Sequence, residues 1–427
     1  MPDSAQHAPA LQRGRWYFGW NIVAVATVLV LLSIGLRLAV GPFFLPIVDD
    51  LGLSRSLFSS IVALALLVYG LVMPGVGWLV GRVGTRRVLL LGTALILAGG
   101  LWAATAHGTL TFTLAFSVVL SLGLALVSPV TLTKIVSTWF VRQRGMALFF
   151  LSTGGMAGLA VVTPALTWAV DLWGWRWALG GYVLLLALIA VPGTLLVMDD
   201  QPPDEADGSA ARTTPLPRRA VQPRYGLWSA LASRPFWLIT IGLLANGYSM
   251  TLLGTHGIPM LVDHGFSAQT AAYGIGLIGL VAIAGTLVLG RMADRFPRRY
   301  ILAAIYFVRG AAFVALMLVA TRQGLYGVAF VGGLVWAGSM AVSSAIMADI
   351  YGVRLISVLY GVAFLCQQLA GMLAAWLGGW GFEVFGTHWI SFGGSVAILL
   401  VGGATALMLP DARAQLAAAA AAARPPV

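Results

Sequence analysis

Long apolar runs separated by short polar segments are the feature that most constrains this chain. A membrane-spanning helix needs about twenty apolar residues, and twelve runs meet that length. Only 9% of the 427 residues are charged, whereas soluble domains carry about a quarter. We therefore predict a membrane protein whose spans are 17–43, 57–80, 87–107, 110–138, 145–169, 177–198, 236–260, 268–290, 300–320, 325–349, 356–383 and 388–409.

The spans are predicted to be helices. In lipid, each backbone N–H and C=O must be satisfied within its own segment unless a closed barrel forms. The runs are continuously apolar and lack the alternating pattern of barrel strands. Gly, Ala and Ser are frequent inside them, which suits close helix packing in lipid. The expected fold class is an all-α, polytopic membrane protein.

The distribution of basic residues predicts the orientation. With the amino terminus in the cytoplasm, nineteen of the 25 Lys and Arg residues fall in cytoplasmic segments. The outside loops hold Arg55, Arg176 and Arg322, and the spans hold Arg37, Lys134 and Arg309. This bias predicts a multi-pass membrane protein with both termini cytoplasmic. The net charge of +11 is thereby explained as a topology signal facing the lipid bilayer, without a nucleic-acid partner.

The longest polar interruption divides the chain into two halves. Residues 199–234 contain "DDQPPDEADGSAARTTPLPRR" and have the composition of a disordered cytoplasmic linker. Six spans lie on each side. The expected organisation is a cytoplasmic segment 1–16, a six-helix bundle 17–198, the linker, a second six-helix bundle 235–410 and a cytoplasmic tail 411–427.

The two halves contain a repeated motif. Residues 77–86 read "GWLVGRVGTR" and residues 290–299 read "GRMADRFPRR". A gapless shift of 213 residues aligns three pairs of identical residues, which are Gly77 with Gly290, Arg82 with Arg295, and Arg86 with Arg299. Each copy lies between the second and third span of its half. The repeat predicts two homologous bundles related by pseudo-symmetry.

The second copy resembles the G-x-x-x-D-R-x-G/P-R-R loop signature of the major facilitator superfamily. Further stretches are similar to the bacterial monocarboxylate and oxalate/formate type of that superfamily. They are "YFGW" at 17–20, "GPFFLPIVDDLGLSRS" at 41–56, "WFVRQRGMAL" at 139–148, "GWRWA" at 174–178 and "ADIYGVRLISVLYG" at 348–361. The resemblance implies a transporter of the bacterial inner membrane in which two bundles rock about a central site.

The resemblance also implies that the signature loop closes the cytoplasmic side during the cycle. Asp294 can accept hydrogen bonds at a neighbouring helix N-terminus, and Arg295, Arg298 or Arg299 could meet Asp349. The alternative is that these arginines only fix topology. The first copy has Gly81 in place of Asp294 and Val136 in place of Asp349. We therefore expect an asymmetric gate, made from the nine residues Gly77, Arg82, Arg86, Gly290, Asp294, Arg295, Arg298, Arg299 and Asp349.

Charge within the spans points to an anionic substrate. A charge at mid-bilayer costs at least about 3 kcal/mol and is seldom retained without a function. Arg37, Lys134 and Arg309 lie within spans, and no acid lies deep in any of them. Arginine is suited to bind a carboxylate. Arg37 is the first candidate ligand, the alternative being an arginine that reaches outward to the interface.

The other candidate substrate ligands each have a structural alternative. Arg309 could instead reach inward to a carbonyl or hydroxyl, and Lys134 could extend to the cytoplasmic interface. Asn246 and His256 share one helical face, and the histidine could relay protons or serve as a hydrogen-bonded packing residue. Amides of the eleventh span could face the cavity or bond between helices; they belong to Gln367 and Gln368.

The chain departs from its apparent relatives in two places. Monocarboxylate and oxalate carriers place an arginine in the eighth helix, but span 268–290 contains no charged residue before the signature loop. Oxalate-type carriers have a lysine in the eleventh helix, which 356–383 lacks. We therefore expect a related carrier for another small organic anion, a mono- or dicarboxylate, coupled to protons or working by exchange.

Catalytic motifs are absent from the sequence. It contains no G-x-x-x-x-G-K-[ST] loop, no H-E-x-x-H and no cysteine–histidine cluster, so we expect no enzyme, cofactor or metal. Cys366 is the one cysteine and cannot form an intrachain disulfide. A monomer is the expected state. The alternatives are an exporter of lipophilic drugs or siderophore-like compounds, for which fifteen tryptophans would suit an aromatic cavity, and a non-transporting membrane sensor.

Overall fold

The computed structural model describes residues 17–140, 143–199, 226–351 and 353–410. The described residues form helices joined by short turns, so the all-α prediction is confirmed. The predicted segment 1–16, most of the predicted linker and the predicted tail 411–427 lie outside the described residues. The described end of the linker carries a short helix, α9, instead of the irregular chain expected from its composition.

The N-terminal half provides six spans. Its elements are α1 (Gly19–Leu38), α2 (Gly41–Leu51), α3 (Arg55–Val83), α4 (Thr85–Thr105), α5 (Thr109–Thr113), the π-helix η1 (Leu114–Leu120), α6 (Ser121–Leu126), α7 (Pro129–Trp139) and α8 (Arg144–Val197). Gly174 divides α8 into the fifth and sixth spans, with φ 79° and ψ 160°. Glycine adopts such a positive φ at little cost, so two spans follow each other without a separate loop.

The C-terminal half provides the other six spans. Its elements are α9 (Leu227–Leu231), α10 (Arg234–Asp263), α11 (Ala268–Arg295), α12 (Arg298–Leu318), α13 (Arg322–Leu334), α14 (Gly338–Tyr351), α15 (Val353–Phe385) and α16 (Trp389–Leu407). Eleven described segments are long and apolar enough to cross a membrane. The bend at Gly174 divides one of them, Met146–Val197, so the twelve predicted spans are present.

Two of these spans are interrupted where the sequence suggested continuous helices. In the fourth span, the helix is broken at Val127 and Ser128, and Pro129 begins α7. Proline is well suited to the first position of a helix, because the N–H group that it lacks would have no partner there. In the tenth, α13 ends at Leu334 and α14 starts at Gly338. Carbonyl groups within such a break lack helical partners and are available to other side chains.

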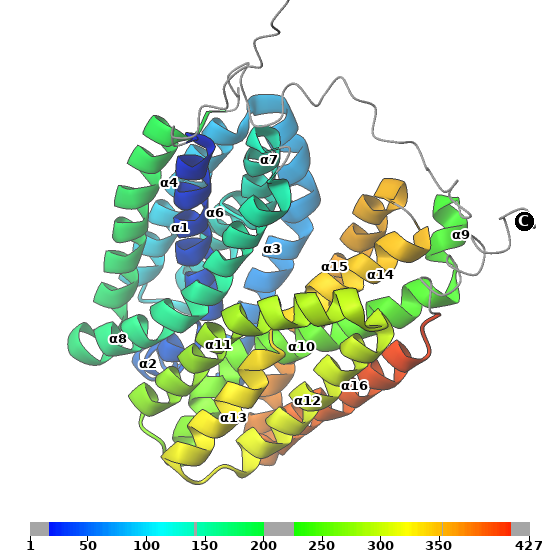
Figure 1. Ribbon diagram of the computed structural model, residues 1–427. Coiled ribbons are helices and arrows are strands. Elements are labelled where there is room, and N and C mark those ends of the chain that lie inside the picture. Colours follow the sequence, from blue (N-terminus) through cyan, green and yellow to red (C-terminus); the bar gives the residue numbers. More distant parts are fainter. Residues whose placement is uncertain (1–16, 141–142, 200–225, 352, 411–427) are drawn as a thin grey trace, which may run out of the picture.

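The two bundles each have their own core and meet along two main helix pairs (Figure 1). In the first half α8 packs on α1 and α4, and in the second α10 packs on α15 and α16. Between the halves, α3 packs on α15 and α8 packs on α11. Small residues allow this approach. For example, Gly279 in α11 lies against the backbone of α8 at Met156 and Ala160.

The spans end at two faces of the molecule, which we call the arginine-rich face and the opposite face. The arginine-rich face carries Arg82 and Arg298, and the opposite face carries Arg55. At the opposite face the halves are in contact, since a side chain at Gly379 in α15 would collide with Ser59 and the carbonyl of Arg55 in α3.

The halves separate toward the arginine-rich face. Among the described residues, a Cβ built at Gly77 or Gly81 in α3, or at Gly290 in α11, would meet no atom within 4 Å. Figure 1 shows α3 and α15 diverging toward the end of the molecule where α9 lies. The structure therefore represents a conformation that is closed at the opposite face.

Candidate functional site

A cavity lies between the two halves, next to the point where α1 ends. Its volume is about 50 Å³. Most of its wall comes from the first half, and Thr251, Gly254 and Thr255 of α10 complete it. The residues from the first half are Leu36, Arg37, Leu38, Val40, Phe43, Ile47, Val62, Ala65, Leu66, Tyr69, Phe116, Leu120, Ser121, Leu124 and Leu179.

Arg37 is the charged residue among those that line this cavity. It lies in the last turn of α1 and is half-buried. Its guanidinium carbon lies 4.7 Å from the centre of the Tyr69 ring, which is a cation–π distance. Within the described part of the chain, the buried Nε of Arg37 has no hydrogen-bond partner. The cavity therefore contains a partly desolvated cation with unused hydrogen-bonding capacity.

The rest of the wall is mainly apolar. Hydroxyl groups come from Tyr69, Ser121, Thr251 and Thr255. Thr255 already donates its hydroxyl hydrogen to the carbonyl of Thr251, at 2.8 Å. Few polar groups in an apolar wall are typical of small-molecule sites, where they fix the orientation of a ligand. This arrangement can bind a small ligand that carries one negative group and an apolar remainder.

Arg309 does not line this cavity. It is fully buried in the second half, where it donates to Asn246 Oδ1 at 2.6 Å, to Ser249 Oγ at 3.4 Å and to the carbonyl of Val335 at 3.0 Å. It also bonds to the carbonyl of Trp336 and lies 4.8 Å from that residue's ring centre. The structure thus shows the alternative in which this arginine reaches inward to carbonyls and hydroxyls.

Asn246 belongs to the same buried cluster. Its Oδ1 accepts from Arg309 and also from Ser339 Oγ, at 2.8 Å. The two carbonyls bound by Arg309 lie in the break between α13 and α14. The cluster therefore joins α10, α12 and α14 within one half. The guanidinium thus satisfies carbonyls that the interruption of the tenth span leaves without helical partners.

His256 is a buried packing residue in this conformation. Its Nε2 donates to the carbonyl of Ala375, 2.8 Å away in α15, and its ring lies edge-on to Phe44 with 5.0 Å between centres. A side chain at Gly378 would collide with the imidazole. The histidine therefore links α10, α15 and α2, and it does not line the cavity around Arg37.

The two glutamines of α15 lie between helices. Gln367 packs its backbone against Gly247 of α10, and the side chain of Gln368 faces Gly70 of α3 across the two halves. Both are buried. Neither glutamine lines the cavity. Gln368 contacts Gly70, however, and the preceding residue, Tyr69, does line it. The position of Gln368 is at the interface that must slide if the halves move.

Lys134 is not among the residues that line the cavity around Arg37. It is exposed, and its Nζ donates to the carbonyl of Val80 at 2.8 Å. Val80 is in the last turn of α3, where carbonyls lack helical partners and the helix dipole favours a cation. The lysine thus caps α3 at the arginine-rich face, which agrees with the interfacial alternative.

The acid proposed for the gate does meet a signature arginine. Arg298 Nη1 lies 2.5 Å from Asp349 Oδ2 and 3.1 Å from the carbonyl of Ala345. Both partners belong to the second half, so the pair joins the start of α12 to α14 and does not cross between bundles. Its part in gating stays a prediction.

The other predicted gating residues lie on the arginine-rich face. Arg299 donates to the carbonyl of Leu409 at 3.3 Å, and Arg82 lies over the Trp78 ring at 5.3 Å. Arg86 and Arg295 are exposed, and open space surrounds Gly77 and Gly290. The side chain of Asp294 lies outside the described residues. In this conformation, none of the described contacts of this group joins the two halves.

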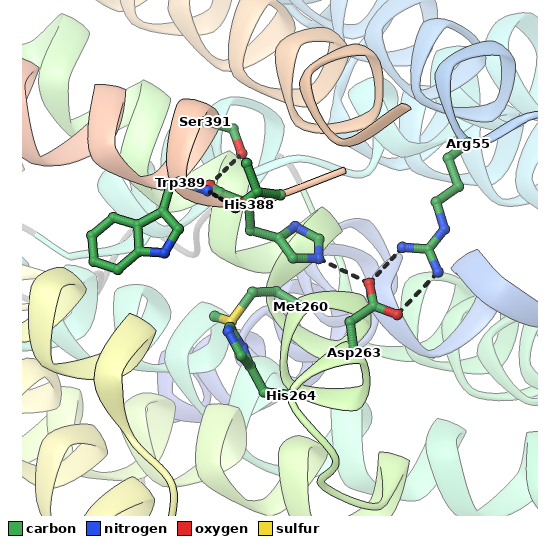
Figure 2. A network of polar contacts seen from close by, with 8 residues as sticks. Arg55, Met260, Asp263, His264, His388, Trp389 and Ser391 are labelled. Carbon is green, nitrogen blue, oxygen red and sulfur yellow. Dashed lines mark hydrogen bonds and ion pairs between the residues drawn. The ribbon is translucent and has the colours of Figure 1, made fainter. Parts of the chain in front are cut away.

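An ion-pair cluster at the opposite face was not predicted. Arg55 of α3 forms a fork on Asp263 of α10, with Nη1 2.5 Å from Oδ2 and Nη2 3.0 Å from Oδ1. His388 donates from Nε2 to the same Oδ2 at 2.8 Å. Figure 2 shows the carboxylate lying between the guanidinium and the imidazole. Because Arg55 belongs to the first half and the other two to the second, this cluster joins the bundles.

Comparisons with known proteins agree with this architecture. The model of the Major Facilitator Superfamily matches residues 23–324 and 258–426. Among solved structures, a bacterial homologue of the human lysosomal transporter Spinster, in an inward-facing and unoccupied conformation, superposes with a TM-score of 0.68 at 18% identity. That match covers 95% of this chain and 99% of the other, and it shows the shared fold.

Three relatives extend the comparison. An uncharacterized MFS-type transporter of Bacillus subtilis, YcxA, is 26% identical over 84% of this chain and 87% of its own. Human monocarboxylate transporter 11 is 28% identical over 93% and 84%. The oxalate:formate antiporter of Oxalobacter formigenes is 23% identical over 88% and 87%. The twelve spans, the repeated halves and the family match together establish that the chain belongs to the Major Facilitator Superfamily.

Proposed function

We propose that this protein is a secondary active transporter that carries a small organic anion, a mono- or dicarboxylate, across the bacterial inner membrane. The observation that carries this proposal is Arg37, a cation with an unpartnered Nε among the described residues, in a cavity between the two bundles. A carboxylate entering this cavity would gain charge-assisted hydrogen bonds from the guanidinium. Relatives named as monocarboxylate and oxalate:formate carriers support the same class.

The transport cycle follows from the position of the cavity. The arginine-rich face is assigned to the cytoplasm by the positive-inside bias, so the described conformation is inward-facing. Rocking of the two bundles would close that face and open the opposite one, exposing the anion site to each side in turn. Coupling to protons or exchange of one anion for another would supply the driving force.

Ligand-dependent thermal stability of the purified protein tests the proposal. A ligand at a hundred times its Kd stabilises the folded state by about 2.7 kcal/mol. Loss of a buried charge partner costs at least about 2 kcal/mol, or roughly thirtyfold in affinity. In Arg37→Gln the same anion concentration should then stabilise the protein by at most about 0.9 kcal/mol. The measurement is a thermal-shift screen with small mono- and dicarboxylates.

The matched control is Arg322→Gln. Arg322 is an exposed arginine near the opposite face whose Nε bonds to Tyr326 at 3.2 Å, so its loss should leave the anion response unchanged. An anion that stabilises the wild type and Arg37→Gln equally would remove Arg37 from the site. If none of the carboxylates stabilises the wild type, the anion proposal fails.

The second candidate is an exporter of lipophilic compounds. The apolar wall around Arg37 favours it, since Val40, Phe43, Ile47 and Phe116 would contact a hydrophobic solute. The two candidates differ in their dependence on charge. A neutral lipophilic ligand that stabilises the wild type and Arg37→Gln to the same extent, in the absence of any carboxylate response, would favour the exporter.

A further inference from the structure

We propose that Asp263 and His388 form a proton-binding site at the opposite face, and that binding of an external proton there weakens the contact with Arg55 that holds the two bundles together. This inference rests on the alternating-access cycle proposed above, but it requires no particular substrate. It concerns residues that the signature loop and the anion cavity do not include.

Several contacts around Arg55 join the two bundles at the opposite face. Arg55 reaches Asp263 through two hydrogen bonds, and its guanidinium carbon lies 4.2 Å from the centre of the Phe382 ring. The neighbouring amide of Ser56, at the start of α3, donates to Glu383 at 2.9 Å. The N-terminus of α3 thus meets two carboxylates of the other half, which suits the positive end of a helix dipole.

His388 can accept a proton. Its Nε2 donates to Asp263, so Nδ1 carries the free lone pair. The side chain is 6% exposed, and within the described residues Nδ1 has no hydrogen-bond partner. A cavity of about 350 Å³ adjoins the cluster and is lined by Asp263, His264 and His388, among others. Histidine is the side chain that ordinarily changes its charge between pH 5 and 8.

The direction of the effect follows from the charges that face Arg55. With neutral His388, the pair of Asp263 and His388 carries a charge of −1 and attracts the guanidinium. With a proton on Nδ1, the pair carries zero charge, and the imidazolium competes with Arg55 for the same Oδ2. Glu383 continues to hold the amide of Ser56. External acid should therefore weaken the connection between the bundles and favour opening of the opposite face.

Two further histidines lie near the cluster. His256 of α10 is within electrostatic reach of His388 and Arg55, and its Nε2 donates to the carbonyl of Ala375. His264 acts in the same direction as His388. His264 follows Asp263 in the chain, its ring centre lies 6.3 Å from that of His388, and its Nδ1 contacts Met260 Sδ at 3.0 Å. Figure 2 shows the Met260 side chain lying between the rings of His264 and His388. A proton on His264 would add positive charge beside Asp263 and would also reduce its attraction for Arg55.

The repeat supplies an internal comparison. The shift of 213 residues that aligns the signature copies also aligns Asp50 with Asp263 and Trp175 with His388. In the first half, Trp175 Nε1 donates to Asp50 at 3.2 Å, and Arg176 of the same half forms an ion pair with that acid. The first-half copy therefore has a ring donor that cannot titrate and an arginine from its own bundle. The second-half copy has a titratable donor and an arginine from the other bundle.

Cysteine accessibility from outside the cell tests the proposal. In a Cys366→Ser background, Thr255→Cys places a thiol on the cavity wall. A membrane-impermeant maleimide added to intact cells reaches it only when the opposite face opens. Labelling rates are normalised to those of the unfolded protein at the same pH, which removes the pH dependence of the thiol itself. For the wild-type gate we expect about a fivefold rise from pH 7.5 to 5.5, equivalent to about 1 kcal/mol.

The variants separate the parts of the proposal. Asp263→Asn and Arg55→Gln should label rapidly at both pH values, and the double variant should match either single one, because one contact is lost in all three. His388→Gln should label slowly at pH 7.5 and lose most of the rise at pH 5.5, because only the weaker effect of His264 remains. The matched control Arg176→Gln removes an ion pair of the same face that lies within one bundle, and it should behave as the wild type.

Several outcomes would overturn the inference. The first is slow labelling of Asp263→Asn at pH 7.5, and the second is a pH response in His388→Gln as large as in the wild-type gate. The third is a double variant of Arg55 and Asp263 that labels faster than either single variant. The fourth is labelling of Arg176→Gln as fast as that of Arg55→Gln. Failure of every carboxylate to bind would leave these labelling results intact. The anion proposal and the proton-site proposal can therefore fail separately.

Discussion

Substitution of Gly379 by alanine should shift the conformational equilibrium of the protein. A Cβ added to it would collide with Ser59 and with the carbonyl of Arg55, but only while α3 and α15 are in contact at the opposite face. Overpacking a tight contact costs about 1–3 kcal/mol. Gly379→Ala should therefore penalise the described conformation alone and shift the population away from it by about five- to 150-fold.

The assay is a distance measurement across that interface. Spin labels at Leu57 in α3 and Phe385 in α15, which are 43% and 53% exposed, would report the separation of the two bundles in a Cys366→Ser background. Double electron–electron resonance on the purified protein should show a longer distance component in Gly379→Ala.

The control substitution lies in the same helix. Gly361 also belongs to α15, but a side chain there meets no described atom within 4 Å. Gly361→Ala gains the same helix propensity, about 1 kcal/mol, without a collision, and should keep the wild-type distance distribution. Identical distributions for Gly379→Ala and Gly361→Ala would refute the reasoning.

Two further predictions concern the other charged groups. Arg309→Met should lower the thermal unfolding temperature by several degrees, because Asn246 and the carbonyls of Val335 and Trp336 lose a buried donor, and each buried acceptor left unpaired costs about 1–3 kcal/mol. Arg322→Met, at an exposed site, should not, and equal melting of both would contradict a structural role for Arg309. Asp294→Asn should impair transport cycling much more than Gly81→Asp, and comparable uptake by the two variants would discard the asymmetric gate.

The lengths and repeats of the sequence were sufficient to predict the architecture. Apolar runs of bilayer length gave the spans, and the 213-residue shift gave the two halves, because hydrophobic thickness and duplication leave direct marks on a chain. Interruptions within spans were harder to predict. A proline such as Pro129 signals one, but nothing in the sequence around Val335 and Trp336 shows that their carbonyls are released from the helix.

Charged residues within the predicted spans identified the candidate ligands, but the sequence did not show which groups surround them. The rarity of such charge selected both Arg37 and Arg309, although Arg37 lines a cavity and Arg309 donates to Asn246 and two carbonyls. Which face of a helix turns toward a neighbour depends on packing. Arg55 was assigned to topology because charges are common at span ends, and its partner Asp263 lies 208 residues away.

The aligned acids of the two halves carry a consequence for how duplicated bundles diverge. Asp50 is neutralised within its own bundle by Arg176, but the residue aligned with Arg176 in the second half is Trp389. The acid of the second half is instead paired with Arg55, a residue of the first half. The dependence runs one way, since exchange of the first half alone would leave Asp263 without its guanidinium, whereas Asp50 keeps Arg176 whatever the second half contains.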